Sequence, residues 1–219
     1  MATRQLLADL AAAWRQQADR SVAFESVGGV DAAQRVQAGE AFDVVVLAAD
    51  AIDKLLAGGH ALAGSRVDVV QSGVAVAVRA GAPRPDIASE DAVRQAVLAA
   101  PSIGYSTGPS GTALLQLFER WGLVAQVKER LVQARPGVPV GSMVASGEVA
   151  LGFQQFSELK DLAGLDVLGP LPPAIQITTT FAGAVCAAST QPQAARELLA
   201  FLAAPQAADL KRRHGMDPA

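Results

Sequence analysis

Apolar positions along the chain follow two spacings in turn, one typical of helices and the other typical of buried strands. The first helix is predicted from apolar residues that recur every three or four positions, namely Leu6, Leu7, Leu10, Ala13 and Trp14. A short strand is predicted at residues 22–27, a helix at 31–38 closed by Gly39, and a second strand at 42–48. This second strand is a continuous apolar run rich in valine, which is typical of a strand covered on both faces.

The remainder of the chain continues the same alternation. Further strands are predicted at residues 67–78, 102–105, 149–154, 165–168 and 177–187. Further helices are predicted at residues 50–56, 89–99, 112–121, 143–146, 157–162 and 193–213, the last broken near Pro205. Strands that alternate with helices in this way predict a doubly wound α/β architecture, in which helices cover both faces of each sheet.

Two clusters of glycine and proline interrupt the alternation and divide the chain. They lie at residues 79–86 (RAGAPRPD) and 169–173 (GPLPP), and each follows a predicted strand. We therefore predict two lobes. The first lobe is discontinuous and comprises residues 1–79 and 178–219, whereas the second, inserted lobe comprises residues 80–177.

Composition narrows the classes of function. A hydrophobic content of 51% over 219 residues is sufficient for a buried core. The net charge of −3 and the scattered basic residues do not favour a nucleic-acid partner. The sequence holds two histidines and one cysteine, Cys186, so it lacks the usual ligands of a metal site and the partner for a disulfide. We therefore expect no metal, no cofactor and a buried, unreactive thiol.

The sequence shows neither a membrane-spanning segment nor an export signal. No apolar run reaches the roughly 20 residues that a membrane-spanning helix needs, so we do not expect the chain to be membrane-embedded. The first residues, MATRQLLADLAAAW, lack the charged segment, apolar core and cleavage site of an export signal. As it stands the sequence predicts a cytoplasmic protein, and a periplasmic one if the natural N-terminus carries a signal.

Six segments stand in a characteristic order, namely AGEAFDVVVLAADAIDKL, VDVVQSGVAVAVRAGAPRPDI, IGYSTGPSGTALLQLFERWGL, GEVALGFQQFSEL, DVLGPLPPAIQ and HGMDPA. Together they resemble the molybdate-binding-like branch of the bacterial extracellular solute-binding proteins, which also includes an aconitate isomerase. The resemblance covers almost the entire chain and implies the type 2 periplasmic-binding-protein fold. In that fold two lobes, each with a mixed sheet, are joined by two crossing strands and close on a ligand by hinge motion. The resemblance also implies a partner, the membrane component of an ABC transporter.

The start of the chain departs from this family. Similar proteins begin with an export signal and a first β-strand that leads into the first helix. Here the chain begins almost at that helix, so the first lobe is predicted to lack this strand, and Thr3 and Arg4 would belong to the loop that approaches the ligand. Either the natural start lies further upstream or the lobe has lost a central strand, and such a loss would leave neighbouring strand edges unpaired.

The best candidate binding loop is residues 106–111 (STGPSG), which follows a predicted strand and precedes a predicted amphipathic helix. A helix N-terminus offers unpaired N–H groups and the positive end of the helix dipole, which favour anions. Glycines let the backbone approach a ligand closely, and hydroxyl groups add donors. The predicted ligand contacts here are Ser106, Thr107, Gly108, Ser110 and Gly111. The alternative is that Ser110 only caps the helix.

Three further segments are candidate ligand contacts, and each has a plainer alternative. Gly28 and Gly29 stand between a predicted strand and a helix, where the aspartate that follows could simply cap the helix. Ser72 lies in a long predicted strand and could be a buried serine satisfied by a neighbouring strand. Gln154 and Gln155 follow an apolar strand beside two phenylalanines, and the alternative for them is a pair of solvent-facing amides.

The nature of the anion depends on Arg4 at the start of the first helix. A guanidinium group matches the geometry of a carboxylate in a bidentate way. Together with the two glutamine amides, an arginine that faces the ligand favours a small di- or tricarboxylate over a tetrahedral oxyanion such as molybdate. The alternative is that Arg4 is a solvated residue of the first turn.

These observations favour binding of a small anionic solute, an oxyanion or a small di- or tricarboxylate, as the substrate-binding component of an ABC-type uptake system. An alternative hypothesis is an isomerase that shifts a proton along an unsaturated tricarboxylate, like an aconitate isomerase. Such an enzyme needs a base near the carbon acid. The candidates Tyr105 and Glu158 are interpreted as structural, so no catalytic residue is assigned. A third hypothesis, the ligand-sensing domain of a regulator, lacks a helix-turn-helix pattern in this sequence.

Overall fold

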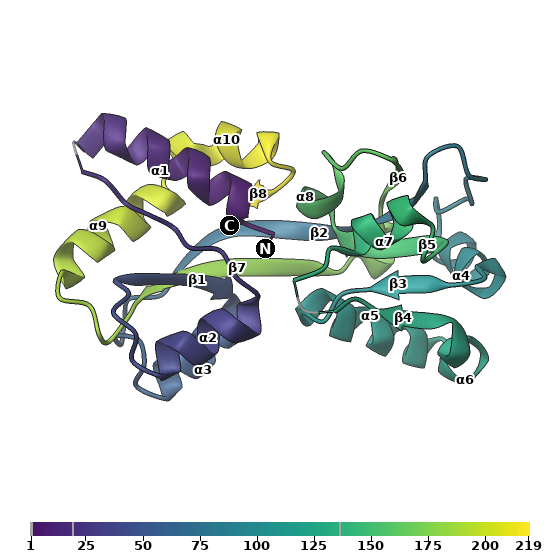
Figure 1. Cartoon of the computed structure of the whole chain (residues 1–219), viewed down its shortest axis with the longest axis horizontal. Coiled ribbons are helices and arrows are strands. Elements are labelled where there is room, and N and C mark those ends of the chain that lie inside the picture. Colours follow the sequence, from purple (N-terminus) through teal and green to yellow (C-terminus); the bar gives the residue numbers. More distant parts are fainter. Residues whose placement is uncertain (1, 19, 136) are drawn as a thin grey trace. The chain divides into compact units, whose positions relative to one another are not determined.

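Most helices and strands lie where the apolar spacing predicts them in a computed structural model, which describes residues 2–18, 20–135 and 137–219 (Figure 1). The helices are α1 (Arg4–Ala18), α2 (Gly29–Gln37), α3 (Ala49–Ala57), α4 (Glu90–Ala99), α5 (Pro109–Arg120), α6 (Val124–Val127), α7 (Val140–Ser146), α8 (Phe156–Leu159), α9 (Pro192–Ala203) and α10 (Ala208–Arg213). The strands are β1 (Val44–Ala48), β2 (Val67–Arg79), β3 (Ile103–Tyr105), β4 (Leu131–Gln133), β5 (Leu151–Gln155), β6 (Leu165–Pro170), β7 (Thr178–Val185) and β8 (Asp217–Pro218). The predicted α/β class is confirmed.

The chain divides into two units. Unit 1 comprises Met1–Ser72 and Thr179–Ala219, and unit 2 comprises Gly73–Thr178. The first crossing lies inside β2, because its first half pairs with β8 of unit 1 and its second half pairs with β5 and β6 of unit 2. The predicted lobe boundary after residue 79 lies at the end of β2, whereas the units divide after Ser72. Breaker residues mark where a strand ends and not where its neighbouring strands change.

Helices cover both faces of the sheet in unit 1. β1 and β7 form an antiparallel pair, and successive side chains of β1 point to opposite faces. Val45 and Leu47 belong to a buried cluster with residues of α2 and α3. Val44 and Val46 pack against a second cluster, to which α1 and α9 contribute. The arrangement is visible in Figure 1, where α2 and α3 lie below these strands and α1 above them.

Residues 20–28 cross unit 1 without forming a strand, so the prediction of a strand at 22–27 is wrong. Val22 and Phe24 still pack against the apolar cluster that includes residues of α1 and α9. The segment lacks a strand partner, and among the described residues β1 pairs only with β7. An apolar run becomes a strand only where a neighbouring strand supplies hydrogen bonds, which the spacing of residues does not reveal.

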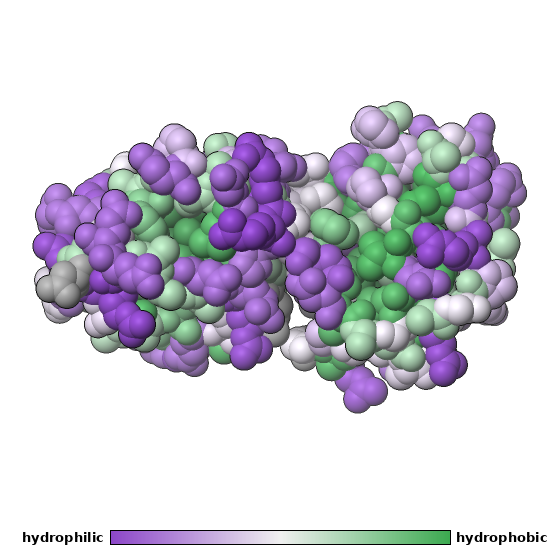
Figure 2. Space-filling view, turned by 90° about the horizontal axis from the view of Figure 1, so that it is seen from above, coloured by the Kyte–Doolittle hydropathy of each residue, from purple (hydrophilic) through white to green (hydrophobic). Residues whose placement is uncertain are grey.

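The first helix shows how the sequence selects a buried face. Leu6, Leu7, Leu10 and Trp14 of α1 are buried, whereas most positions between them are exposed. Figure 2 views unit 1 from the side of α1 and α10, where polar residues form much of the surface. Within the described ranges, no helix has the length and apolar character that crossing a bilayer requires.

Unit 2 is built on a mixed sheet with the strand order β4-β3-β5-β2-β6. β3 runs parallel to β4 and β5, whereas β2 runs antiparallel to β5 and β6. The four strands other than β2 therefore point the same way, and their carboxyl ends meet at one edge of the sheet. Along β2, Val74, Val76 and Val78 join the cluster formed with α4 and α5, whereas Ala75 and Ala77 join the one formed with α8.

Two glycines let α7 approach the sheet of unit 2 closely. A Cβ atom at Gly104 in β3 would lie 2.8 Å from Cγ2 of Val149 and 3.0 Å from Cγ1 of Val140. A Cβ atom at Gly152 in β5 would overlap Cγ2 of Val144. Larger side chains at either position would push α7 away from the sheet, so these glycines fix where the first turn of α7 lies.

Two elements near the carboxyl edge of unit 2 differ from the prediction. The strand β4 was not predicted, because its three residues are too few to show a period of two. Helix α5 begins at Pro109 rather than at residue 112, and proline is favoured at the first helical position because it has no N–H group to satisfy. As a result, Ser110 and Gly111 belong to the first turn of α5 and not to the loop before it.

Candidate functional site

The carboxyl edge of unit 2 brings together segments that lie far apart in the sequence. Tyr105, the last residue of β3, stands opposite Gln133 of β4 and Phe153 of β5. The segments that follow these three strands are therefore neighbours. The carboxyl edge of parallel strands is where ligands bind in open α/β sheets, and we call this set of segments the carboxyl-edge site.

The first segment of the carboxyl-edge site is the loop from Ser106 into α5. The hydroxyl oxygens of Ser106 and Ser110 lie 3.1 Å apart and share a hydrogen bond. The backbone N–H groups of Gly111 and Thr112 donate to the carbonyl oxygen of Gly108, at 3.0 and 3.2 Å. Gly108 is the N-cap residue and supplies no side-chain cap, so the alternative that Ser110 only caps the helix is wrong.

Gly111 is required by this winding of the loop. A Cβ atom on Gly111 would overlap the backbone carbonyl oxygen of Ser106, which cannot move aside like a flexible side chain. At Gly108, by contrast, the nearest atom to an added Cβ is the hydroxyl oxygen of Ser106, at 4.0 Å. The loop thus places two hydroxyl groups beside the positive, N-terminal end of a 12-residue helix, a combination that suits an anion.

The second segment follows β4 and carries Arg135, which was not among the predicted ligand contacts. The N–H group of Ala134 donates to the carbonyl oxygen of Tyr105 at 2.9 Å, which ties the end of β4 to the end of β3. Arg135 comes next and is exposed. Arg35 and Arg66 both pair with carboxylates, but no ion pair of Arg135 occurs among the described residues. The missed signal was an arginine directly before the sequence Pro-Gly, shortly after the strand residues LVQ.

The third segment follows β5 and contains Gln154, Gln155 and Glu158. Both glutamines are 4% exposed, so the alternative of solvent-facing amides is wrong. The amide oxygen of Gln154 accepts a hydrogen bond from the N–H group of Gly141 at 3.0 Å. Its amide nitrogen donates to Oε2 of Glu158 at 2.5 Å. Gln154 therefore joins the first turn of α7 to α8, and both ends of its amide are engaged inside unit 2.

Glu158 is the ionisable group with a perturbed pKa in this segment. Its side chain is half-buried, and burial raises the pKa of the carboxyl group above its usual value, while the positive charge of the N-terminus and, to a smaller extent, the hydrogen bond from Gln154 act in the opposite direction. A carboxyl group in this environment exchanges its proton nearer to neutral pH than a solvated one. This environment makes Glu158 more than the structural residue that was predicted, because it perturbs the pKa of the carboxyl group.

The remaining predicted contacts belong to unit 1. Thr3 is 7% exposed, and its carbonyl oxygen accepts from the N–H group of Leu7 at 2.8 Å, while Arg4 begins α1 and is exposed. Gly28 is the N-cap residue of α2 and Gly29 is its first residue. The carbonyl oxygen of Gly28 accepts from the N–H group of Ala32 at 2.9 Å.

The plainer alternatives for unit 1 concern Asp31 and Ser72. Asp31 lies in the first turn of α2 and makes no side-chain cap, so the alternative that it caps this helix is wrong. Ser72 is 1% exposed within β2 and has an interaction partner, in keeping with a buried serine that is satisfied.

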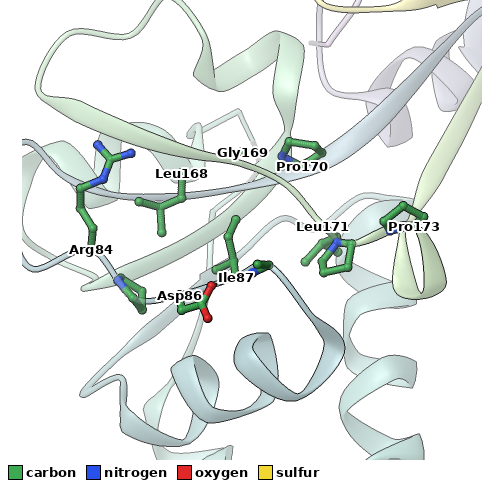
Figure 3. Close-up of a pocket in the computed structure, with 11 residues that line it drawn as sticks. Arg84, Asp86, Ile87, Leu168, Gly169, Pro170, Leu171 and Pro173 are labelled. Carbon is green, nitrogen blue, oxygen red and sulfur yellow. Dashed lines mark hydrogen bonds between the residues drawn. The ribbon is translucent and has the colours of Figure 1, made fainter.

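Unit 2 also has an apolar groove, which differs from the carboxyl-edge site in its lining residues (Figure 3). It has a volume of about 410 Å³ and is lined by residues 84–88 and 168–173. Prolines and aliphatic side chains dominate its lining, and its charged residues are Arg84 and Asp86, of which Arg84 pairs with Asp166 at 3.7 Å. None of the predicted ligand contacts lines this groove, so its size does not make it the better candidate for an anion.

The histidine, cysteine and acidic side chains decide whether the protein can bind a metal ion or use a reactive thiol. Among the described residues, no group of three or more histidine, cysteine or acidic side chains is placed to hold a metal ion. Cys186 is 1% exposed, and burial raises its pKa to about 11, with the negative charge of Asp43 adding to the effect. The predicted burial of this thiol is confirmed.

Comparison with known proteins places the fold. The family model of the bacterial extracellular solute-binding proteins matches residues 1–217. An aconitate isomerase from Pseudomonas sp. is 44% identical over 187 residues, which cover 84% of this chain and 70% of the isomerase. The periplasmic molybdate-binding protein of Azotobacter vinelandii shares a TM-score of 0.80 at 22% identity, over 98% of this chain and 94% of that one.

A second solved structure gives the same result. The tungstate ABC transporter structure from Geobacter sulfurreducens shares a TM-score of 0.72 at 17% identity, over 94% of this chain and 91% of that one. At such low identity the two solved structures establish the fold alone, which is the two-lobe fold of periplasmic binding proteins. The predicted fold and resemblance are thus confirmed.

Proposed function

Because the chain belongs to the bacterial extracellular solute-binding proteins, we propose that it binds a small anion whose oxygen atoms contact the carboxyl-edge site of unit 2. The observation that carries the proposal is the pairing of the Ser106 and Ser110 hydroxyl groups, 3.1 Å apart, at the N-terminus of α5. The positive end of the α5 dipole and the hydroxyl donors beside it both favour an anion.

We further propose that the anion is a di- or tricarboxylate. Arg135 follows β4 at the same edge and has no ion-pair partner among the described residues, and a guanidinium group binds a carboxylate in a bidentate way. Arg4 offers a second guanidinium group at the start of α1 in unit 1. Contacts from Thr3, Arg4, Gly28, Gly29 and Ser72 to the same ligand remain part of the proposal.

As a receptor, the protein would capture its anion outside the cytoplasmic membrane and deliver it to the membrane component of an ABC transporter. This role is supported by the family, and by the structural similarity to a molybdate-binding protein and a tungstate transporter. A receptor shows saturable binding without turnover.

The class of anion is tested by a thermal-shift screen of molybdate, tungstate, sulfate, citrate, and cis- and trans-aconitate. A ligand that binds only the folded state raises the melting temperature. We expect the tricarboxylates to stabilise the protein and the double variant Ser106→Ala/Ser110→Ala to lose this stabilisation. Stabilisation by tetrahedral oxyanions alone would overturn the carboxylate assignment. An unchanged response of the double variant would overturn the placement of the anion at the carboxyl-edge site.

A second candidate function is isomerisation of a small unsaturated tricarboxylate. Two observations favour it, namely the 44% identity to a protein named aconitate isomerase and the half-buried Glu158 at the edge that carries the proposed anion donors. An enzyme converts its ligand, so the two functions are distinguished by following trans-aconitate with the protein by NMR. Formation of the cis isomer supports the isomerase, and an unchanged ligand that nevertheless binds supports the receptor.

A further inference from the structure

We propose that Glu158 is the acid–base group that moves the proton in this isomerisation, and that Gln154 positions its carboxylate. The inference rests on the second proposed function and names the residue which that function requires. Helix α8 begins at Phe156, directly after the last residue of β5, so Glu158 belongs to the same edge as Ser106 and Ser110.

One oxygen of the Glu158 carboxylate is oriented by Gln154. Its Oε2 atom accepts the hydrogen bond from Gln154, and the Gln154 side chain is itself fixed by the N–H group of Gly141. Among the described residues, Oε1 has no hydrogen-bond donor. One oxygen is thus oriented and the other is left for a proton, which is the arrangement that a general base needs.

Burial of Glu158 supports the same role. A half-buried carboxylate with a raised pKa is a stronger base than a solvated one. The other carboxylate near α8 is less suited, because Asp161 pairs with Lys160 at 2.6 Å.

The proposed step moves one proton and leaves the enzyme unchanged. The Glu158 carboxylate removes a proton from the methylene carbon of the tricarboxylate, and the electron pair of that C–H bond forms a double bond to the central carbon. The electron pair of the former double bond shifts toward the other outer carbon and its carboxylate. The Glu158 carboxylic acid then returns a proton to that outer carbon, and rotation while the charge is delocalised allows the geometry to change.

The charge that develops in this step needs donors. The intermediate carries its extra negative charge on carboxylate oxygens, and hydrogen-bond donors already in place stabilise such charge without reorganisation. The hydroxyl groups of Ser106 and Ser110 and the guanidinium group of Arg135 are donors at the same edge. The roles therefore separate, because these donors bind the anion whereas Glu158 transfers the proton.

The experiment compares binding and turnover in the same variants. Binding of trans-aconitate is measured by isothermal titration calorimetry, and its conversion to the cis isomer is followed through the vinyl proton by NMR. The test variant is Glu158→Gln, and the matched control is Glu148→Gln, which changes an exposed glutamate of the same unit. Glu158→Asp, which keeps the carboxylate but shortens its reach, covers the case in which the glutamine variant does not fold.

We expect Glu158→Gln to bind trans-aconitate as the unchanged protein does and to lose isomerisation by about 100-fold or more, which is the usual contribution of a general base. Glu148→Gln should keep both, and Glu158→Asp should lose turnover with binding retained. Full turnover in Glu158→Gln, or binding without turnover in the unchanged protein, would overturn the role of Glu158 while anion binding stands. Absence of tricarboxylate binding in the unchanged protein would overturn the proposed function itself.

Discussion

The amide of Gln154 donates a hydrogen bond to the carboxylate of Glu158, four residues further along the chain. This contact links the end of β5 to α8, and it opposes the effect of burial on the pKa of Glu158. The hydrogen bond from Gln154 therefore lowers the pH at which this carboxyl group ionises.

Replacing Gln154 by methionine should change the pH dependence of turnover. The donor that favours the ionised form is lost, so the pKa of Glu158 should rise and the acidic limb of the kcat profile should move to higher pH. The positive charge of the N-terminus also lowers the pKa of Glu158 and is unchanged in this variant, while Asp166 of β6 contacts Arg84 and Lys160 contacts Asp161.

The control for this prediction is Gln155→Met, which changes the neighbouring buried amide. A profile displaced equally in both variants, or in neither, would argue against a specific effect of Gln154 on Glu158.

The stability of the protein should depend on pH through Glu158. Its pKa is raised in the folded state above the usual value of 4.5, so the carboxyl group costs no stability while it is protonated in both states. As the pH rises above the unfolded value, the unfolded chain ionises first and the folded state is disfavoured. Glu158→Gln should therefore melt at a higher temperature than the unchanged protein at pH 7, with a smaller difference at pH 4. Equal differences at both pH values would contradict this assignment.

Lys211 is a second buried ionisable residue, in unit 1. It is 1% exposed, and burial lowers its pKa below the usual value of 10.5. Because the folded state holds this proton less tightly than the unfolded chain, stability should increase as the pH rises through the folded pKa. Lys211→Met should raise the free energy of unfolding at pH 7 by about 1 kcal/mol, because a buried charge is replaced by an apolar side chain of similar length.

Chemical denaturation measures this difference, and Lys54→Met is its control. The Lys54 side chain is 77% exposed, so its replacement should have little effect. A clearly less stable Lys211→Met variant would show instead that the ammonium group has a favourable partner.

Gly111→Ala should disable the carboxyl-edge site. The added methyl group would overlap the carbonyl oxygen of Ser106, so the loop must shift at a cost of about 1–3 kcal/mol, and the hydroxyl pair would separate. Gly108→Ala meets no atom closer than 4.0 Å and should retain stability. Thermal melts with and without citrate compare the two variants, and equal behaviour would contradict the assigned role of Gly111.

Comparison of prediction and structure shows which information the sequence contains. β2 was predicted almost completely, because its valines and alanines alternate and breaker residues follow its end. Residues 22–27 have a similar apolar content but no strand partner, and β4 is too short to show a period. Pairing partners come from distant parts of the chain, so neither result was accessible from local spacing.

The candidate site shows the same division. The loop at 106–111 could be predicted, because glycine, proline and serine between a strand and a helix have a local meaning. Arg135 and Glu158 could not be selected, since their relation to that loop depends on the parallel register of β3, β4 and β5. The hydrogen bond from Gln154 to Glu158 likewise depends on where α8 turns away from the sheet.

The measurement that tests the central claim most directly is calorimetric titration of citrate into the Arg135→Gln variant, with Arg120→Gln as the control. Arg120 lies in the last turn of the same unit's α5, at the opposite end of the helix from the site. We expect Arg135→Gln to lower the affinity by about 10-fold or more, since a hydrogen bond to a charged group contributes about 1.5–3 kcal/mol, and Arg120→Gln to leave it unchanged. Equal affinity for citrate in both variants and the unchanged protein would contradict a carboxylate-binding role for the carboxyl-edge site.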